Sequence, residues 1–310
     1  MLIFTLCMIE SVLTTPMFLP VAIEDEIRTA CVFYYQRMAV CLSSSYLLPF
    51  LPVITDRLLS PLTVANMNEY MMLLIKMITT YGTEIGEVLD SQLSTVVLKV
   101  HELVTTGEVS VTPQSDEERE LTDLKRQYFL LLGTIASSHL LFVLLSETNY
   151  GNLQVILDSV IQGCGAIGDP VSQRYNFGTL ASMTKEWLGE GNGPTSAVPL
   201  PEGFVDTFLS WVLHTAVPLA FEVPFSLRFN LLDAKSSEAL TEMGQFERAL
   251  YLALGPQFEQ HLLALLPSTS LRCAPDVAQQ YIDGLKSGST AKQWKKFKTE
   301  FLAYHRKLQR

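Results

Sequence analysis

The sequence lacks the short motifs that mark the commonest enzyme active sites. The 310 residues contain no G-x-x-x-x-G-K-[ST] phosphate loop, no G-x-S-x-G nucleophile elbow and no H-E-x-x-H zinc motif. The five histidines are far apart in sequence, and no cysteine and histidine group has the spacing of zinc ligands. We therefore expect a protein that is not an enzyme and that binds no cofactor or metal. A catalytic triad needs no local motif, so an enzyme stays open as the third-ranked alternative.

Paired cysteines are missing as well. The five cysteines are scattered, odd in number and set among apolar residues, and no C-x-x-C occurs: Cys7, Cys31, Cys41, Cys164 and Cys273. The sequence also has no N-x-[ST] glycosylation site. This pattern is typical of buried thiols in a reducing compartment.

Charged residues are scarce, at 17% against 48% hydrophobic residues, which indicates a large buried core and argues against disorder. The net charge of −10 argues against non-specific nucleic-acid binding by the whole surface. The charge is uneven, however. Residues 281–310 contain eight Lys and Arg against two Asp and Glu, a net +6, so the other 280 residues carry −16.

Two apolar stretches could be taken for membrane or targeting segments. Residues 1–20 have no basic region and no small-residue cleavage site, and Glu10 interrupts them. Residues 127–146 carry no charge, and their length matches a membrane span. Their middle nevertheless holds Gly, Thr, two Ser and His139, which favours two buried helices broken near Ser137. We predict no membrane insertion.

Apolar residues recur at helical spacing along the chain. Ser115 and Glu118 form a capping box that opens one helix. Only residues 108–112 and 221–229 look strand-like, and we expect both to be extended linkers. Further helices are expected at 24–42, 151–165, 170–188, 203–214, 235–253, 256–266, 275–286 and 291–308.

The helices come in pairs at a loose spacing of roughly 40 residues, which is typical of HEAT or armadillo repeats. We predict an all-α fold, an α-solenoid of stacked antiparallel helix pairs. It would form one continuous repeat domain over residues 1–310, with a looser linker at 189–203 that is rich in Gly and Pro. A globular helical bundle is the alternative.

Residues 160–178 contain a misleading fingerprint. Gly163, Gly165 and Gly168 spell G-x-G-x-x-G, the dinucleotide-binding pattern. The residues before it have a helical and not a strand period, and Asp169-Pro170 opens a new helix only after the third glycine. We predict a turn between two helices that binds no nucleotide.

The last helix is the sharpest candidate site. Trp294, Phe297, Phe301, Tyr304 and Leu308 share one face, which we expect to dock on the preceding pair. Trp187 and Trp211 are likewise expected in the core. The opposite face of the last helix gathers the candidate RNA-binding residues Lys292, Lys295, Lys296, Arg306, Lys307 and Arg310. They form either a phosphate-binding stripe for structured RNA or the solvated outer face of a capping helix.

Several segments, in order, resemble the exportin-T family of tRNA export receptors. They cover nearly the whole chain: residues 37–42 (RMAVCL), LLPFLP (47–52), KRQYF (125–129), VIQG (160–163), Asp169-Pro170, EWLG (186–189), FNLLDA (229–234), GPQFEQHL (255–262) and APDVAQQY (274–281). The resemblance is to the C-terminal part of a longer receptor.

The resemblance implies a HEAT-repeat superhelix that carries tRNA from nucleus to cytoplasm together with Ran-GTP. It also implies passage through the pore by contact with nuclear pore proteins, and shuttling between nucleus and cytoplasm. Ran-GTP contacts in the family lie mainly in N-terminal repeats, which the resemblance does not cover. The alternative function is a HEAT scaffold that binds only proteins.

Overall fold

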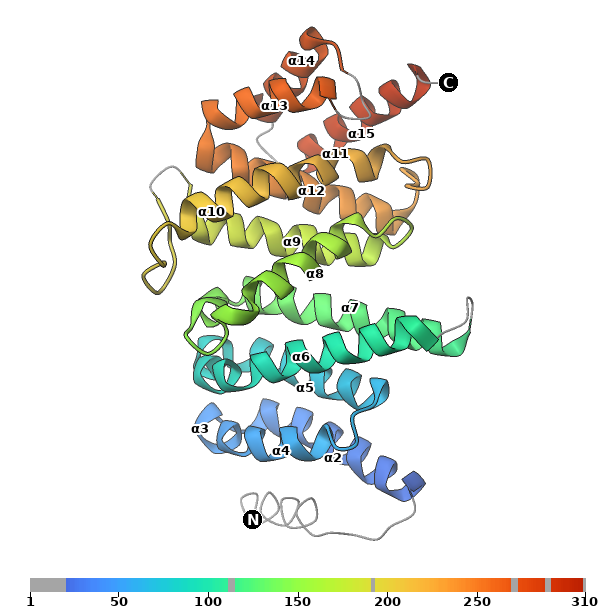
Figure 1. Cartoon of the computed structure of the whole chain (residues 1–310), viewed down its shortest axis with the longest axis vertical. Helices are drawn as coiled ribbons and strands as arrows, with labels where there is room; N and C mark the ends of the chain where they lie inside the picture. Colours follow the sequence, from blue (N-terminus) through green and yellow to red (C-terminus); the bar gives the residue numbers. More distant parts are fainter. Residues whose placement is uncertain (1–20, 111–114, 191–192, 269–272, 288–290, 309–310) are drawn as a thin grey trace. The chain divides into compact units, whose positions relative to one another are not determined.

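The computed structural model describes residues 21–110, 115–190, 193–268, 273–287 and 291–308, and every regular element in these ranges is a helix (Figure 1). The all-α, helical-repeat prediction is therefore confirmed. The chain divides into two compact units, residues 1–152 and 153–310. The prediction that one continuous solenoid joins them stays a prediction.

Unit 1 is a two-layer stack of helices. Its main helices are α2 (Val21–Cys41), α4 (Leu51–Leu58), α5 (Val64–Tyr81), α6 (Gly86–Ser110) and α7 (Asp116–Ser137). Helices α2, α5 and α7 pack in succession as one layer, while α4 and α6 form the other (Figure 1). Short turns connect them: α3 (Ser44–Leu47), η1 (Leu48–Phe50), η2 (Gly82–Ile85), η3 (Leu141–Leu145) and η4 (Tyr150–Asn152).

Unit 2 repeats this arrangement. Helices α9 (Pro170–Trp187), α12 (Ala234–Leu254) and α15 (Ala291–Leu308) pack in succession. The remaining helices lie against them: α8 (Leu153–Gly165), the run α10 (Phe204–Trp211), η5 (Val212–Ala216) and α11 (Val217–Phe225), then α13 (Pro256–Ser268) and α14 (Pro275–Ser287) (Figure 1).

Helix starts follow the local signals in the sequence. The Ser115 hydroxyl accepts a hydrogen bond from the Glu118 backbone N–H at 3.2 Å, which confirms Ser115 as the N-cap of α7. The Asp169 carboxylate accepts one from the Ser172 N–H at 3.3 Å, and Pro170 is the first residue of α9. Both caps satisfy N–H groups that a helix start leaves without an internal partner.

Three expectations need correction. Residues 108–110 belong to helix α6, and residues 221–225 end helix α11, so neither stretch is an extended linker over its described part. Phe221, Val223 and Phe225 alternate like a strand but are buried within unit 2, because tertiary packing outweighs a weak local preference.

Helix α7 does end at Ser137, as predicted, but only a short 3₁₀ turn follows it. Residues 1–20 lie outside the described residues.

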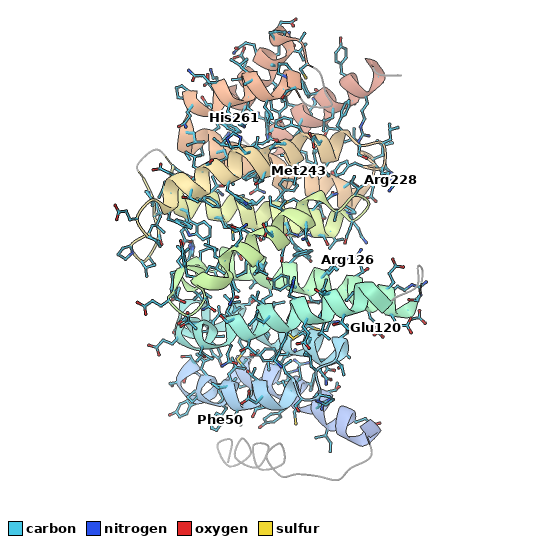
Figure 2. The ribbon with its side chains drawn as sticks, in the orientation of Figure 1. Phe50, Glu120, Arg126, Arg228, Met243 and His261 are labelled. Carbon is cyan, nitrogen blue, oxygen red and sulfur yellow. The ribbon has the colours of Figure 1, made fainter. Side chains whose placement is uncertain are left out.

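Pro218 reshapes the helical run α10–α11. The turn η5 is a π-helix, in which the Val217 N–H bonds to the Val212 carbonyl. The Leu213 carbonyl would take its own π-type bond from residue 218, but proline has no N–H. His261 of α13, labelled in Figure 2, supplies the partner. Its Nε2 lies 3.1 Å from the Leu213 oxygen, and because a carbonyl only accepts, Nε2 donates. This bond ties α13 to the π turn.

The run Phe204–Phe225 is the one segment of the described chain that is long and apolar enough to cross a membrane by length and composition. Many of its side chains are buried within unit 2, including Phe208, Val212 and Phe221. A core helix meets the same criteria, and the buried side chains of this run lie within unit 2, whose helices α8 and α12 pack against it.

Candidate nucleic-acid interface

Helix α15 docks on unit 2 through one well-defined face. Trp294, Lys298 and Leu302 are buried, one turn apart from each other. Trp294 fits against Gly244 of α12, where a Cβ would overlap the indole ring, and Phe297 fits against Gly284 of α14 in the same way. The glycines of α12 and α14 thus leave space for the aromatic side chains of α15.

The docked face differs from the one that the sequence indicates. Tyr304 was expected in it, but its side chain is 59% exposed. Lys298, a charged residue, is fully buried in its place. The helix is therefore rotated toward Lys298 and Leu302, by somewhat less than the roughly 100° that separates successive residues.

Because of this rotation, the candidate RNA-binding residues differ in their exposure to solvent. Lys296 and Lys307 are exposed, and Lys295 is half-buried. Lys296 makes only a loose surface ion pair with Glu300, at 3.9 Å. The side chain of Lys292 and all of Arg310 lie outside the described residues. Exposed ion pairs of this kind contribute little to stability.

Arg306, also a candidate RNA-binding residue, binds backbone carbonyls of its own unit. Its guanidinium Nη2 donates to the backbone carbonyls of Ser226 at 2.7 Å and Phe229 at 2.8 Å, and also to that of Pro224. These carbonyls belong to the end of α11 and the loop that follows it. Arg306 therefore caps the C-terminus of α11, where a cation is favoured.

A buried ionic cluster lies under α15. The Lys298 ammonium donates to the Glu247 carboxylate of α12 and, at 3.2 Å, to the Ala220 carbonyl of α11. The Tyr281 hydroxyl of α14 donates to the other carboxylate oxygen at 2.6 Å. The ammonium also lies 4.9 Å from the centre of the Phe221 ring. The Lys298 side chain thus contacts two other helices, α11 and α12, and the Glu247 carboxylate links it to a third, α14.

Burial dominates the titration of this cluster. It raises the pKa of Glu247 and lowers the pKa of Lys298, while their mutual attraction opposes both shifts. Burial also raises the pKa of the Tyr281 hydroxyl well above its usual value. The one signal for Lys298 in the sequence was its helical spacing, because it lies four residues from both Trp294 and Leu302.

The glycines of the fingerprint form a turn between helices. Gly163 and Gly165 lie inside α8, and Gly168 occupies the turn with a φ of 94°, a conformation that favours glycine. The N-terminus of α9, where a pyrophosphate would bind, is instead capped by the Asp169 carboxylate. A negative cap at that place disfavours a second anion.

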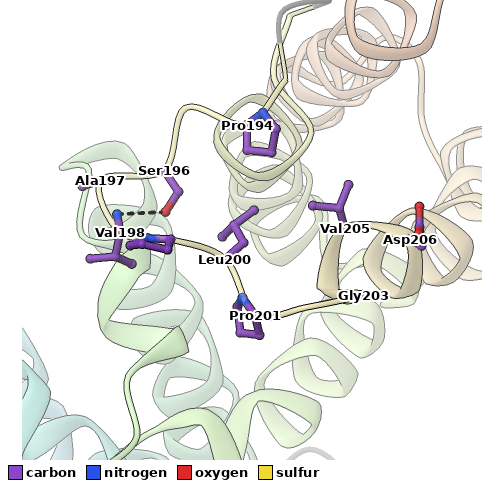
Figure 3. Close-up of a pocket in the computed structure, with 10 residues that line it drawn as sticks. Pro194, Ser196, Ala197, Val198, Leu200, Pro201, Gly203, Val205 and Asp206 are labelled. Atoms are coloured by element: carbon purple, nitrogen blue, oxygen red, sulfur yellow. Dashed lines mark hydrogen bonds between the residues drawn. The ribbon is translucent and has the colours of Figure 1, made fainter.

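An open pocket of about 500 Å³ lies where residues 193–203, an irregular segment, meet the start of α10 (Figure 3). The segment is anchored by the Thr195 N–H, which donates to the Glu186 carbonyl at 2.9 Å. The pocket is lined mostly by Pro, Val, Ala and Leu, and Asp206 is the one charged residue among its described lining. The described lining of this pocket therefore contains no positively charged side chain that could bind a phosphate.

The two other tryptophans expected in the core differ in burial. Trp187 is fully buried, edge-on to Phe204 and Phe208, as expected, whereas Trp211 is only half-buried. No group of three or more His, Cys, Asp or Glu side chains within the described ranges could hold a metal ion.

Stacked helix pairs in two layers define a helical-repeat protein, a class whose extended surfaces bind other macromolecules. The family model of exportin-T matches residues 16–306, nearly the whole chain. The chain belongs to the exportin-T family, a family of nuclear export receptors, and the resemblance seen in the sequence is confirmed.

Individual relatives agree. The chain is 28% identical over 301 residues to Exportin-T of Dictyostelium discoideum, covering 95% of this chain and 26% of the relative. It is 28% identical over 262 residues to Exportin-T of Mycosarcoma maydis (84% and 22%) and 25% identical over 264 residues to that of Homo sapiens (85% and 26%). The chain thus spans about a quarter of the length of these relatives.

Proposed function

We propose that this chain forms part of a nuclear export receptor that binds tRNA together with Ran-GTP. The receptor carries tRNA from the nucleus to the cytoplasm, passes the pore by contacting nuclear pore proteins, and catalyses no reaction. The observation that carries the proposal is the family match over residues 16–306. The layered helix stacks support it, because stacked helical repeats offer extended surfaces for binding other macromolecules.

Within this chain, we assign the RNA contact to the outer face of α15. Exposed Lys296 and Lys307 and half-buried Lys295 supply positive charge, and Lys292 and Arg310 complete the candidate set. Structured RNA is recognised largely through its backbone and shape, which requires charge at suitable spacing and no catalytic group. Arg306 contributes less, because its guanidinium bonds three backbone carbonyls.

The test is a filter-binding titration of the 310-residue chain with tRNA over a range of salt concentrations. Reversing Lys292, Lys295 and Lys296 to Glu should weaken binding and flatten its salt dependence. Each lost phosphate contact should reduce the log–log slope by roughly 0.7–0.9. A matched control reverses Lys99, Lys185 and Lys235, which lie on α6, α9 and α12 and change the net charge equally.

A specific effect of the first variant supports the assignment to α15. Equal effects of both triple variants would mean that only net charge matters. If the unchanged chain shows no salt-dependent tRNA binding, the rival function is favoured, a helical scaffold that binds only proteins. The net charge of −16 outside residues 281–310 suits such a scaffold.

A further inference from the structure

The apolar residues of α15 do not define a single docked face. Trp294, Phe297, Phe301, Leu302 and Tyr304 cover a wide arc of the helix when placed at roughly 100° per residue. Hydrophobic burial is non-directional and scales with area. Apolar contact alone therefore permits the helix to dock in more than one rotational register.

We infer that the buried ion pair between Glu247 and Lys298 selects the register of α15 and thereby decides which of its lysines face solvent. The inference rests on the proposed function only in taking those lysines as RNA contacts. In this role Lys298 is a positioning residue, since it is buried and touches no ligand itself.

The alternative register shows why the ion pair is decisive. If Tyr304 were buried, as the apolar pattern indicates, Lys298 would turn toward solvent. Glu247, which is fully buried on α12, would then lose its cation. Removing one partner of a buried ion pair is strongly destabilising, because it leaves an uncompensated charge in a medium of low dielectric constant.

The Lys298 ammonium is also bound directionally. Its acceptors, the Glu247 carboxylate and the Ala220 carbonyl, come from α12 and α11, and Tyr281 of α14 orients the carboxylate. Hydrogen bonds have preferred angles, unlike apolar contacts. Arg306, two turns further along α15, binds the loop after α11 and supports the same register.

The selected register has a direct consequence for the basic face. With Lys298 turned inward, Lys296 and Lys307 point to solvent and Lys295 lies at the edge of the interface. Rotating Tyr304 inward would carry Lys296 and Lys307, which lie roughly 60–80° from it on the helical wheel, to the edge of the interface, and would turn Lys295 outward. The ion pair thus decides which lysines of the basic face point to solvent.

The experiment compares two neutralised ion pairs in the full 310-residue chain. The test variant is Glu247→Gln/Lys298→Met, in which Gln still accepts from the Tyr281 hydroxyl. The matched control is Glu259→Gln/Lys286→Met, which neutralises the partly exposed pair between α13 and α14, 2.8 Å apart. Each carries a reporter cysteine, Tyr304→Cys or Leu302→Cys, with Cys7 and the exposed Cys41 replaced by Ser.

The readout is the ratio of thiol-labelling rates at the two reporters, together with the melting temperature. In the chain with the intact Glu247–Lys298 pair and in the control variant, the cysteine at position 304 should react much faster than the cysteine at position 302. In the test variant the ratio should fall about tenfold, which corresponds to about 1.4 kcal/mol of lost register preference. A ratio that stays unchanged in the folded test variant would overturn the inference, because the aromatic contacts at Gly244 and Gly284 would then set the register.

A second arm separates this inference from the proposed function. If tRNA binds α15, the test variant should show an altered affinity and salt slope, because a different set of lysines faces solvent, and the control should keep both. If tRNA does not bind even the unchanged chain, the proposed function fails while the labelling ratio still decides the register. Should the double variant not fold, Glu247→Gln alone, which keeps the shape of the side chain, replaces it and should lower the ratio in the same direction.

Discussion

Trp294 is the residue on which the docking of α15 depends most at the scale of single side chains. It is buried against Gly244 and contacts the rings of Tyr281 and Phe297. Its indole N–H has no hydrogen-bond partner among the described residues, so its contribution is one of packing. Replacing it therefore removes buried apolar contact without leaving a polar group stranded.

We predict that Trp294→Ala lowers the free energy of unfolding by about 3–5 kcal/mol. Tyr304→Ala, at a side chain that is 59% exposed on the same helix, should change it by no more than about 0.5 kcal/mol. Urea unfolding of both variants measures the difference. Equal losses would show that the docked face of α15 is wrongly placed.

His261 is the second residue with a testable role. Partial burial and the nearby ring of His214 lower its pKa, although the hydrogen bond to the Leu213 carbonyl opposes the shift. Because the folded pKa lies below the unfolded value of about 6.5, the unfolded chain binds the proton more readily in mildly acidic solution. The contribution of His261 to stability is therefore present above pH 6.5 and is lost as the pH falls through that value toward the folded pKa.

We predict that melting temperatures of the unchanged chain and of His261→Gln converge as the pH is lowered from about 7.5 to 5.5. Glutamine can still donate to the Leu213 carbonyl but does not titrate. His261→Ala should be less stable than His261→Gln by about 1–3 kcal/mol at neutral pH, because it leaves that carbonyl without its partner. A stability advantage of the unchanged chain over His261→Gln that grows on acidification would refute the assigned shift.

At the scale of elements, the α8–α9 turn shows how a local pattern is resolved by its setting. The three glycines match a nucleotide fingerprint, but two lie within α8 and the N-terminus of α9 is capped by Asp169. We predict no measurable binding of NAD or ATP by calorimetry, for the unchanged chain and for Gly165→Ala alike. Nucleotide binding that disappears in Gly165→Ala would contradict this interpretation.

Most helices were predictable at this scale because their signals are contiguous. The predicted ranges 151–165, 170–188, 256–266, 275–286 and 291–308 match observed helices to within a few residues. The π turn η5 was not predicted. Pro218 is visible in the sequence, but whether a helix ends at a proline or bulges around it depends on an external donor, here His261, 48 residues from Leu213.

At the scale of the whole molecule, the chain spans about a quarter of the length of its Exportin-T relatives. Cooperative binding requires that both ligands favour one conformational state of the receptor. We predict that the 310 residues alone do not bind Ran-GTP tightly. Surface-immobilised binding assays test this, and nanomolar affinity of the isolated chain would refute it.

The sequence by itself determined the helices, their caps and the repeat class, because 3.6-residue periodicity and capping are properties of neighbouring residues. It also contained the family resemblance. Only the tertiary structure decided the register of α15, and with it which members of the basic face are exposed. Glu247 and Lys298 are 51 residues apart, and neither differs in local sequence from a solvated charge. They become partners only when stacking buries both, since an isolated charge in the core is so unfavourable that the nearest opposite charge must turn inward.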